Sequence, residues 1–148
     1  IGRLDEDSEG LLLLTTDGMM SEVVRSKKVE KEYYAQVDGI ITEQAVEQLK
    51  NGVEIGFNGR KYSTKKCTAS LLNEIPNLGE RGKKIRDERH GPTSWVSITL
   101  TEGKFRQVRK MTSAVGFPTL RLVRVRVGNI HLNDLKAGEV LEVASFDV

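Results

Sequence analysis

The sequence predicts an α+β fold built on a largely antiparallel sheet. Residues 31–37 and 95–101 alternate between apolar and polar side chains, as half-buried strands do. Residues 42–52 and 105–115 carry apolar side chains at helical spacing. Strands and helices are mixed without the regular strand-helix-strand rhythm of a parallel sheet. The 148 residues suit one domain, or two small halves that share a core.

The first elements are predicted from an apolar run and a helix cap. Four leucines at 11–14 lie between a glycine and two threonines, which predicts a short, fully buried strand. The Asp17 carboxylate can accept hydrogen bonds from free backbone N–H groups at the start of a helix over about 18–26. In the strand at 31–37, one face carries the alternating side chains Tyr33, Ala35 and Val37.

The middle of the chain is predicted to form a helix, two strands and a loop. Thr42 is the expected N-cap of a helix that ends at Gly52. Strands at 53–55 and 65–72 are expected on either side of a turn at 57–59. Residues 74–92 contain prolines, glycines and a run of charges, which predicts a long and partly mobile loop.

The last third is predicted to contain a strand, a helix and two further strands. In the strand at 95–101, Val96, Ile98 and Leu100 point inward. The apolar stripe of the helix at 105–115 contains Phe105, Val108, Met111 (or Thr112) and Val115, and Gly116 ends it. The alternation of the strand at 120–127 slips, which predicts a β-bulge near Val123. Residues 139–143 read as a final short strand.

The charge of the chain is unevenly distributed. Its 23 basic and 21 acidic residues give a net charge of +2, but residues 1–74 sum to −3 and residues 75–148 to +5. Between 81 and 126, twelve basic residues stand against three acidic ones. Such a cluster is expected of a protein that binds a phosphate-rich partner, although a solvated basic face is the common alternative.

Several classes of protein and site are excluded or disfavoured. The longest apolar run has four residues, far below the roughly 20 that a transmembrane helix needs. With Cys67 as the single cysteine, no intramolecular disulfide can form, which favours a reducing compartment. His90 and His131 lie too far from Cys67 and from each other for a zinc motif. The acids at 5–9 resemble a calcium loop, but Thr16 occupies the position that needs a bidentate carboxylate.

Basic residues between 104 and 126 are candidates for contact with phosphates. On a helix, Arg106, Arg109 and Lys110 would share one face with Ser113, opposite the apolar stripe. Guanidinium groups and helix N-termini both suit phosphate oxygens, and the strand at 120–127 adds further arginines. Only 5% of the residues are aromatic, which argues against a base-stacking sheet, so we expect contact mainly with backbone phosphates.

Four stretches, in order along the chain, form a set of motifs. They are Gly2-Arg3-Leu4-Asp5 with Ser8-Glu9-Gly10-Leu11-Leu12-Leu13-Leu14-Thr15, then Lys31-Glu32-Tyr33, then Glu102-Gly103-Lys104-Phe105-Arg106-Gln107-Val108-Arg109-Lys110-Met111, and finally Gly116-Phe117-Pro118-Thr119-Leu120-Arg121-Leu122. This set resembles the motifs of RNA pseudouridine synthases, in the branch that modifies ribosomal RNA. The resemblance extends over nearly the whole chain, to about Val143.

The resemblance implies isomerisation of one uridine to pseudouridine, in 23S rRNA of the large subunit, without cofactor or metal. It implies a synthase-like catalytic domain over residues 1–148, with two α+β halves around a central cleft and Asp5 at its floor. Asp5 would be the essential carboxylate, Tyr33 would stack on the flipped base, and Arg109 would pair with Asp5. The expected substrate-binding residues are Arg3, Lys31, Lys104, Arg106, Gln107, Lys110, Leu120 and Arg121.

Blander interpretations stay open for each of these features. The acids at 5–9 could form a simple acidic turn, Tyr33 could be a core tyrosine with Tyr34 in its place, and Leu120 could pack in the core. The whole basic surface could belong to a non-catalytic RNA-binding or ribosome-assembly module. A purely structural fragment is a third possibility.

The start of the chain departs from the family pattern. Members normally begin well before the aspartate motif, with a strand that ends in a Lys-Pro pair, whereas this chain starts at Ile1. We therefore expect an N-terminally truncated domain with an exposed sheet edge that can promote association with another chain. For the full-length protein we expect a cytoplasmic monomer with RNA as its partner, and neither DNA nor a membrane.

Overall fold

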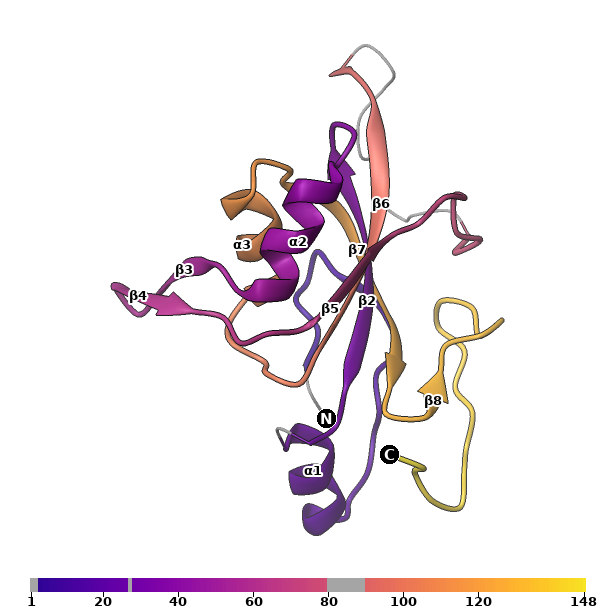
Figure 1. Ribbon diagram of the computed structural model, residues 1–148. Helices are drawn as coiled ribbons and strands as arrows, with labels where there is room; N and C mark the ends of the chain where they lie inside the picture. The colour runs from indigo at the N-terminus through magenta and orange to yellow at the C-terminus, as the bar shows by residue number, and fades with distance from the viewer. Residues whose placement is uncertain (1–2, 27, 80–89) are drawn as a thin grey trace.

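A computed structural model describes residues 3–26, 28–79 and 90–148 (Figure 1). Three helices and eight strands are assigned within these residues. In chain order they are β1 (Glu9–Gly10), α1 (Gly18–Arg25), β2 (Lys31–Asp38), α2 (Glu43–Asn51), β3 (Glu54–Phe57), β4 (Arg60–Ser63), β5 (Thr68–Leu71), β6 (Thr93–Leu100), α3 (Gln107–Ala114), β7 (Thr119–Val127) and β8 (Ile130–His131).

One sheet organises the molecule, and the α+β prediction is confirmed. Its strands follow the order β1-β7-β2-β6-β5, and β8 pairs with β7 beside that path. All of these pairings are antiparallel except that of β1 with β7, which is parallel. β3 and β4 form a separate hairpin that projects away from the sheet (Figure 1).

The core divides into two clusters that share this sheet. The larger one joins α2 and α3 to the sheet through side chains such as Leu49, Ile98 and Met111. The smaller one gathers around Val24 of α1 and Val127 of β7. The division into two α+β halves, with a cleft between them, stays a prediction.

Capping side chains define the first two helices as the sequence predicts. The Asp17 carboxylate accepts hydrogen bonds from the backbone N–H groups of Met19 and Met20. The Thr42 hydroxyl accepts one from Ala45 N, and α2 ends before Gly52, where φ is +100°. These caps depend on local sequence alone, which is why the pattern identified them.

The prediction of a fully buried strand at 11–14 is wrong. The strand is Glu9–Gly10, and Leu12 and Leu14 are 46% and 68% exposed whereas Leu11 and Leu13 are buried. The backbone beyond Gly10 is extended enough to alternate its side chains between core and solvent, so only every second leucine is buried.

The turn at 57–59 joins a different pair of strands from the predicted one. Asn58 and Gly59 both have positive φ and connect β3 to β4, a strand that the sequence analysis missed. Asn-Gly is the preferred two-residue hairpin turn, so this signal was present in the sequence. Of the loop predicted at 74–92, residues 80–89 lie outside the described residues.

Two predictions about the last third had different outcomes. Strand β7 has an irregularity near Val123, as predicted: Val125, between Arg124 and Arg126, has no partner on β2. A second irregularity lies opposite Gln36/Val37, and Val123 itself pairs regularly with Tyr34. Residues 139–143 form no strand, and Val140 and Leu141 are 84% and 73% exposed. Burial of these side chains therefore does not stabilise a strand here.

Candidate active site

An acidic loop at the N-terminus forms the centre of the candidate site. Residues 5–8 make a turn closed by a hydrogen bond from Ser8 N to Asp5 O at 3.0 Å. Parallel pairing of Glu9 and Gly10 with Val123 and Arg124 fixes the end of this loop on the sheet. The loop is therefore held at both ends, by its own turn and by β7.

Gly10 is required for this attachment. Its φ is +115°, and a Cβ built there would lie 2.2 Å from the carbonyl oxygen of Arg124. Only glycine allows the backbone of β1 to approach β7 so closely.

Arg106 is the cation that reaches Asp5. Its guanidinium donates two hydrogen bonds to Asp7, at 2.9 and 3.0 Å, and a longer one of 3.4 Å to Asp5 Oδ2. The hydrogen bond from Arg106 lowers the pKa of Asp7 to about 2, so this carboxylate is ionised at neutral pH. Asp7 is tightly bound, whereas Asp5 keeps one long contact and a side chain that is 31% exposed.

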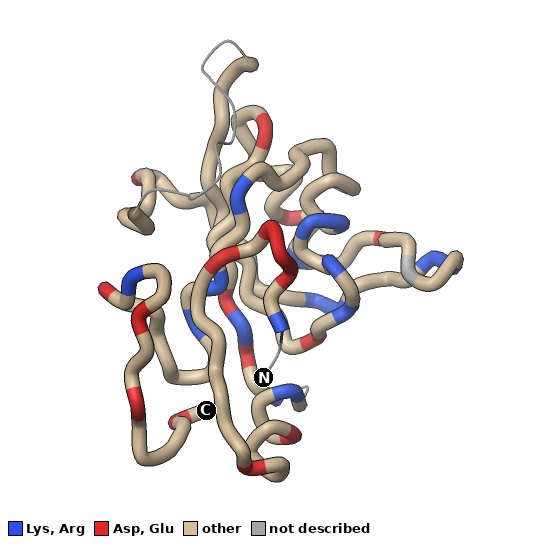
Figure 2. Tube along the Cα trace, turned by 180° about the vertical axis from the view of Figure 1, so that it is seen from behind, with Lys and Arg blue, Asp and Glu red and all other residues tan. Residues whose placement is uncertain are grey.

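The pairing of Arg109 with Asp5 that the sequence predicted is replaced by contacts with the neighbouring residues. Arg109 Nη2 donates to the carbonyl oxygen of Asp7 at 2.8 Å and to Ser8 Oγ at 3.3 Å. It thus supports the turn that presents Asp5 and leaves the direct contact to Arg106. Figure 2 shows the acidic loop beside the basic positions of α3.

α3 starts at a different residue from the predicted one, which explains why Arg106 contacts Asp5 and Arg109 does not. The helix begins at Gln107, and Arg106 precedes it in the left-handed conformation, with φ of 52°. Phe105 lies outside the helix and is 61% exposed, so it does not belong to the apolar stripe. The left-handed residue turns the Arg106 side chain toward the acidic loop, away from the predicted face shared with Lys110.

A buried carboxylate, Glu102, holds the turn before α3 in place. It accepts hydrogen bonds from the Tyr62 hydroxyl, from Lys65 N at 2.8 Å and from Gln107 Nε2 at 2.8 Å. Burial opposes its ionisation, but these donors together lower its pKa below the usual value. Gln107 in turn accepts a hydrogen bond from Lys104 N at 3.1 Å, so the turn is fixed from both sides.

We expect Glu102→Ala to destabilise the fold strongly. The substitution leaves three donors without their acceptor, two of them on the hairpin side, and should cost roughly 3 kcal/mol or more. Glu54→Ala is the matched control, because Glu54 is exposed and its ion pair with Lys61 is 4.0 Å long, so its loss should stay within about 0.5 kcal/mol. Urea unfolding of both variants measures the difference, and equal effects would contradict the role assigned to Glu102.

Tyr33 lies on β2, two strands away from Gly10 at the end of the acidic loop. It pairs with Arg124 of β7, which pairs with Gly10 of β1, so two strand spacings, about 10 Å, separate the Tyr33 and Gly10 backbones. Tyr33 is half-buried and packs against the larger core cluster. The structure records no contact between Tyr33 and Asp5 among the described residues, so its stacking role stays a prediction.

Arg124 is a residue of this region that the sequence analysis did not select. It is 4% exposed, lies directly opposite Tyr33, and donates from Nε to the carbonyl oxygen of Leu11 at 2.9 Å. Its Nη2 atom is buried without a hydrogen-bond partner among the described residues. The sequence analysis had counted Arg124 only among the basic residues of the strand at 120–127, because spacing does not show that its side chain is buried beside Leu11.

The remaining predicted substrate-binding residues lie in different surroundings. Arg3 is exposed, Leu120 is half-buried in β7, and half-buried Lys31 donates to the Ser26 carbonyl. Arg121 is buried and forms a two-bond ion pair with Glu9, at 3.0 Å for each bond. Gln107 is buried beneath the turn described above. Gln107 and Arg121 both bond to carboxylates within the protein, and their contact with a substrate stays a prediction.

Two lysines lie against the hairpin. Lys104 Nζ is 5.1 Å from the centre of the Tyr62 ring, and Lys110 Nζ donates to the Gly56 carbonyl at 2.9 Å. A surface hollow runs between β3 and α3 and is lined by Gly56, Arg109 and Lys110 among others. The hairpin is therefore continuous with the residues that hold the acidic loop.

The described residues contain neither a metal-binding cluster nor a membrane-spanning helix. No group of three or more His, Cys, Asp or Glu side chains among them is arranged to hold a metal ion. None of the described helices has the length and apolar character needed to cross a membrane.

Comparisons with known proteins agree on one family. The family model described as RNA pseudouridylate synthase matches residues 1–114. Ribosomal large subunit pseudouridine synthase E of Vibrio parahaemolyticus is 42% identical over 96% of this chain and 58% of that protein. The protein of the same name from Xanthomonas axonopodis pv. citri is 40% identical over 90% of this chain and 70% of its own length.

The fold comparison agrees with the sequence comparison. A crystal structure of a pseudouridylate synthase superimposes with a TM-score of 0.71 and 28% identity, over 91% of this chain and 50% of that one. The chain spans about 58–60% of the length of the two Vibrio relatives that it matches. With the family model covering well over half of its residues, the chain belongs to the RNA pseudouridylate synthase family.

Proposed function

We propose that this protein isomerises a uridine of large-subunit ribosomal RNA to pseudouridine, with Asp5 as the essential carboxylate. The observation that carries the proposal is the acidic loop, in which Asp7 receives both short bonds from Arg106 while Asp5 stays partly exposed with one long contact. A carboxyl group held this loosely can approach a substrate atom without first giving up a strong ion pair. The names of the relatives, which specify the large ribosomal subunit, support the choice of RNA.

In the proposed reaction the base leaves its sugar and returns in a new orientation. The N1–C1′ bond breaks, the uracil turns, and C1′ bonds to C5, which loses its proton while N1 gains one, so that no atom is gained or lost. Asp5 acts on the nucleotide, and the contact from Arg106 directs its side chain. Arg109 shapes the turn that carries Asp5. No cofactor or metal is needed for this atom balance.

Other residues are proposed to bind the flipped nucleotide. Extruding a base from its stack costs a few kcal/mol, and stacking on Tyr33 would return about 1–3 kcal/mol of this. Leu120 would line the uracil pocket beside it. Arg3, Lys31, Lys104 and Lys110 are proposed to contact phosphates, with Gln107 and Arg121 supporting them from beneath.

The proposal extends to partners and compartment. RNA is the expected partner, with no role for DNA or a membrane, and the protein is expected to be a monomer in the cytoplasm. The open edge of β1 is the place where the chain could associate with another.

Mapping of pseudouridines in ribosomal RNA tests the proposal. In cells from which the gene has been deleted, one pseudouridine of the large-subunit RNA should disappear, and it should return when the gene is restored. An unchanged set of pseudouridines would contradict the proposal and favour the non-catalytic RNA-binding module, which predicts retention of RNA without isomerisation.

A further inference from the structure

The arginines that the sequence analysis assigned to phosphates are largely neutralised within the protein. Arg106 pairs with Asp7, Arg121 with Glu9, and Arg126 with Glu32. Each of these carboxylates would have to be displaced before a phosphate could take its place. The described part of the predicted basic surface therefore supplies few cations that RNA can reach directly.

In contrast, the segment that contains the β3–β4 hairpin carries cations that are exposed to solvent. Between residues 53 and 66 the chain carries four cations, Arg60, Lys61, Lys65 and Lys66, and one acid, Glu54. All four cations are exposed. The Glu54–Lys61 ion pair is 4.0 Å long between highly exposed side chains, so it competes weakly with another anion.

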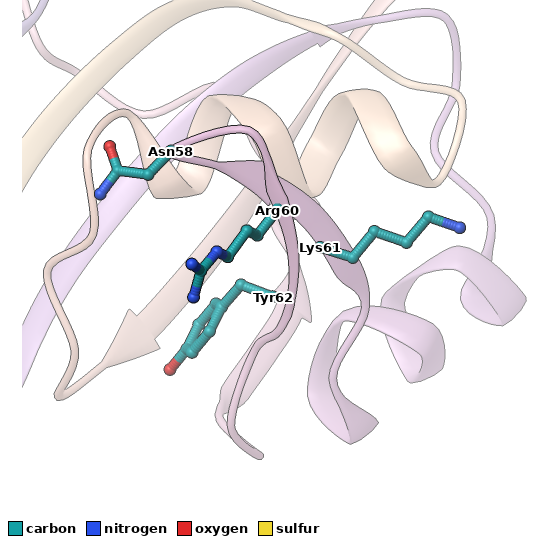
Figure 3. A pocket seen from close by; sticks show the side chains of 4 residues that line it. All are labelled: Asn58, Arg60, Lys61 and Tyr62. Carbon is teal, nitrogen blue, oxygen red and sulfur yellow. The ribbon is translucent and has the colours of Figure 1, made fainter.

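The side chains of the hairpin also suit a nucleic acid. Figure 3 shows Arg60 beside the Tyr62 ring, in a surface pocket that Asn58 and Lys61 also line. An arginine fork suits phosphate oxygens and also stacks on planar groups. An aromatic ring set among cations provides a surface against which a base can lie.

The hairpin is fixed relative to Asp5 by described contacts. Glu102 joins Tyr62 and the Lys65 backbone to Gln107 at the start of α3, immediately after Arg106. Lys110 joins α3 to Gly56 on β3. A strand of RNA held on the hairpin would thus lie at a constant distance from the acidic loop, along the hollow between β3 and α3.

We propose that Arg60, Lys61, Lys65 and Lys66 form a phosphate-binding arm that holds RNA beside the acidic loop. This inference rests on the proposed function for its substrate but assigns the binding to a surface outside the four family motifs. The arm contributes affinity through phosphates, and Asp5 performs the chemistry. Loss of the arm should therefore weaken binding without slowing conversion of bound RNA.

Charge-neutral variants test the arm. The pairs Arg60→Gln/Lys61→Gln and Lys65→Gln/Lys66→Gln each remove two exposed cations. Binding of a large-subunit rRNA transcript should weaken, and the slope of log affinity against log salt should become shallower by about 1.4–1.8 for each pair. The single-turnover rate at saturating transcript should stay unchanged. Arg25→Gln/Lys136→Gln, on α1 and near the C-terminus, removes the same charge from exposed positions and should leave the slope unchanged.

The outcomes separate this inference from the proposed function. If the hairpin variants keep the wild-type salt slope, or lose no more than the control pair, the arm does not bind RNA and the inference is wrong. If they lose RNA binding but no pseudouridine forms even with the wild-type protein, the arm stands and the proposed function fails. Weaker binding to polyglutamate with unchanged RNA affinity would assign the surface to an acidic protein and overturn the inference.

Discussion

Asp5→Asn should abolish pseudouridine formation while the protein stays folded. The amide has the shape of the carboxylate but neither its charge nor its basicity, so a reaction that needs an ionised group at this position should slow by about 10³-fold or more. The loop should keep its conformation because Arg106 retains both bonds to Asp7 and Arg109 retains the Asp7 carbonyl. The measurement is the pseudouridine yield in rRNA of gene-deleted cells that express the variant.

Glu6→Gln is the matched control for the loss of one charge in the same loop. Glu6 is exposed and lies next to Asp5, so a general effect of loop charge would appear in both variants. We expect Glu6→Gln to restore the pseudouridine fully. A normal yield from Asp5→Asn, with wild-type thermal stability, would disprove the catalytic role of Asp5.

Gly10→Ala should strongly destabilise the fold. The added methyl group would lie 2.2 Å from the Arg124 carbonyl oxygen and 2.5 Å from its amide nitrogen, both backbone atoms that cannot move aside separately. β1 would have to separate from β7, and Leu11 N would lose its 2.8 Å hydrogen bond to the same carbonyl. We expect the free energy of unfolding to fall by about 3 kcal/mol or more.

Gly59→Ala separates the steric clash from backbone strain. Gly59 also has a positive φ, +73°, but a Cβ there meets nothing within 4 Å. Its replacement should cost only the strain of a left-handed alanine, about 1–2 kcal/mol. Urea unfolding compares the two variants, and a cost for Gly10→Ala no greater than that for Gly59→Ala would contradict the close approach of β1 to β7.

Local signals in the sequence were reliable where the neighbouring residues decide the structure. The helix caps at Asp17 and Thr42 formed as predicted because the capping oxygen and the N–H groups that it accepts from lie within three residues. The strands at 31–38 and 93–100 also followed from their alternation. By contrast, the partners of the 57–59 turn were wrong because the Asn-Gly signal fixes a hairpin but the boundaries of its short strands depend on pairing.

The candidate site, too, was predictable only in part from the sequence. Its motifs brought Asp5, Arg106 and Arg109 into one hypothesis, and the structure places them together. Spacing alone did not predict which cation contacts which acid, because the helix begins two residues later than predicted and is preceded by a left-handed Arg106. The turn before α3 is held by Glu102, which bonds to Gln107 five residues later and to Tyr62 of the β3–β4 hairpin. No local sequence pattern predicts contacts of this kind.

The sequence by itself determined the α+β class, the helix caps and the identity of the chemical motifs, because these depend on side-chain type and short-range spacing. Tertiary structure alone decided which charges remain available. The +9 stretch at 81–126 reads as a phosphate-binding surface, yet several of its arginines meet carboxylates from residues 7, 9 and 32. Opposite charges distant in sequence meet only when the sheet brings β1 and β2 against β7. Among the described residues, four exposed cations lie on or directly after a hairpin that the charge distribution did not single out.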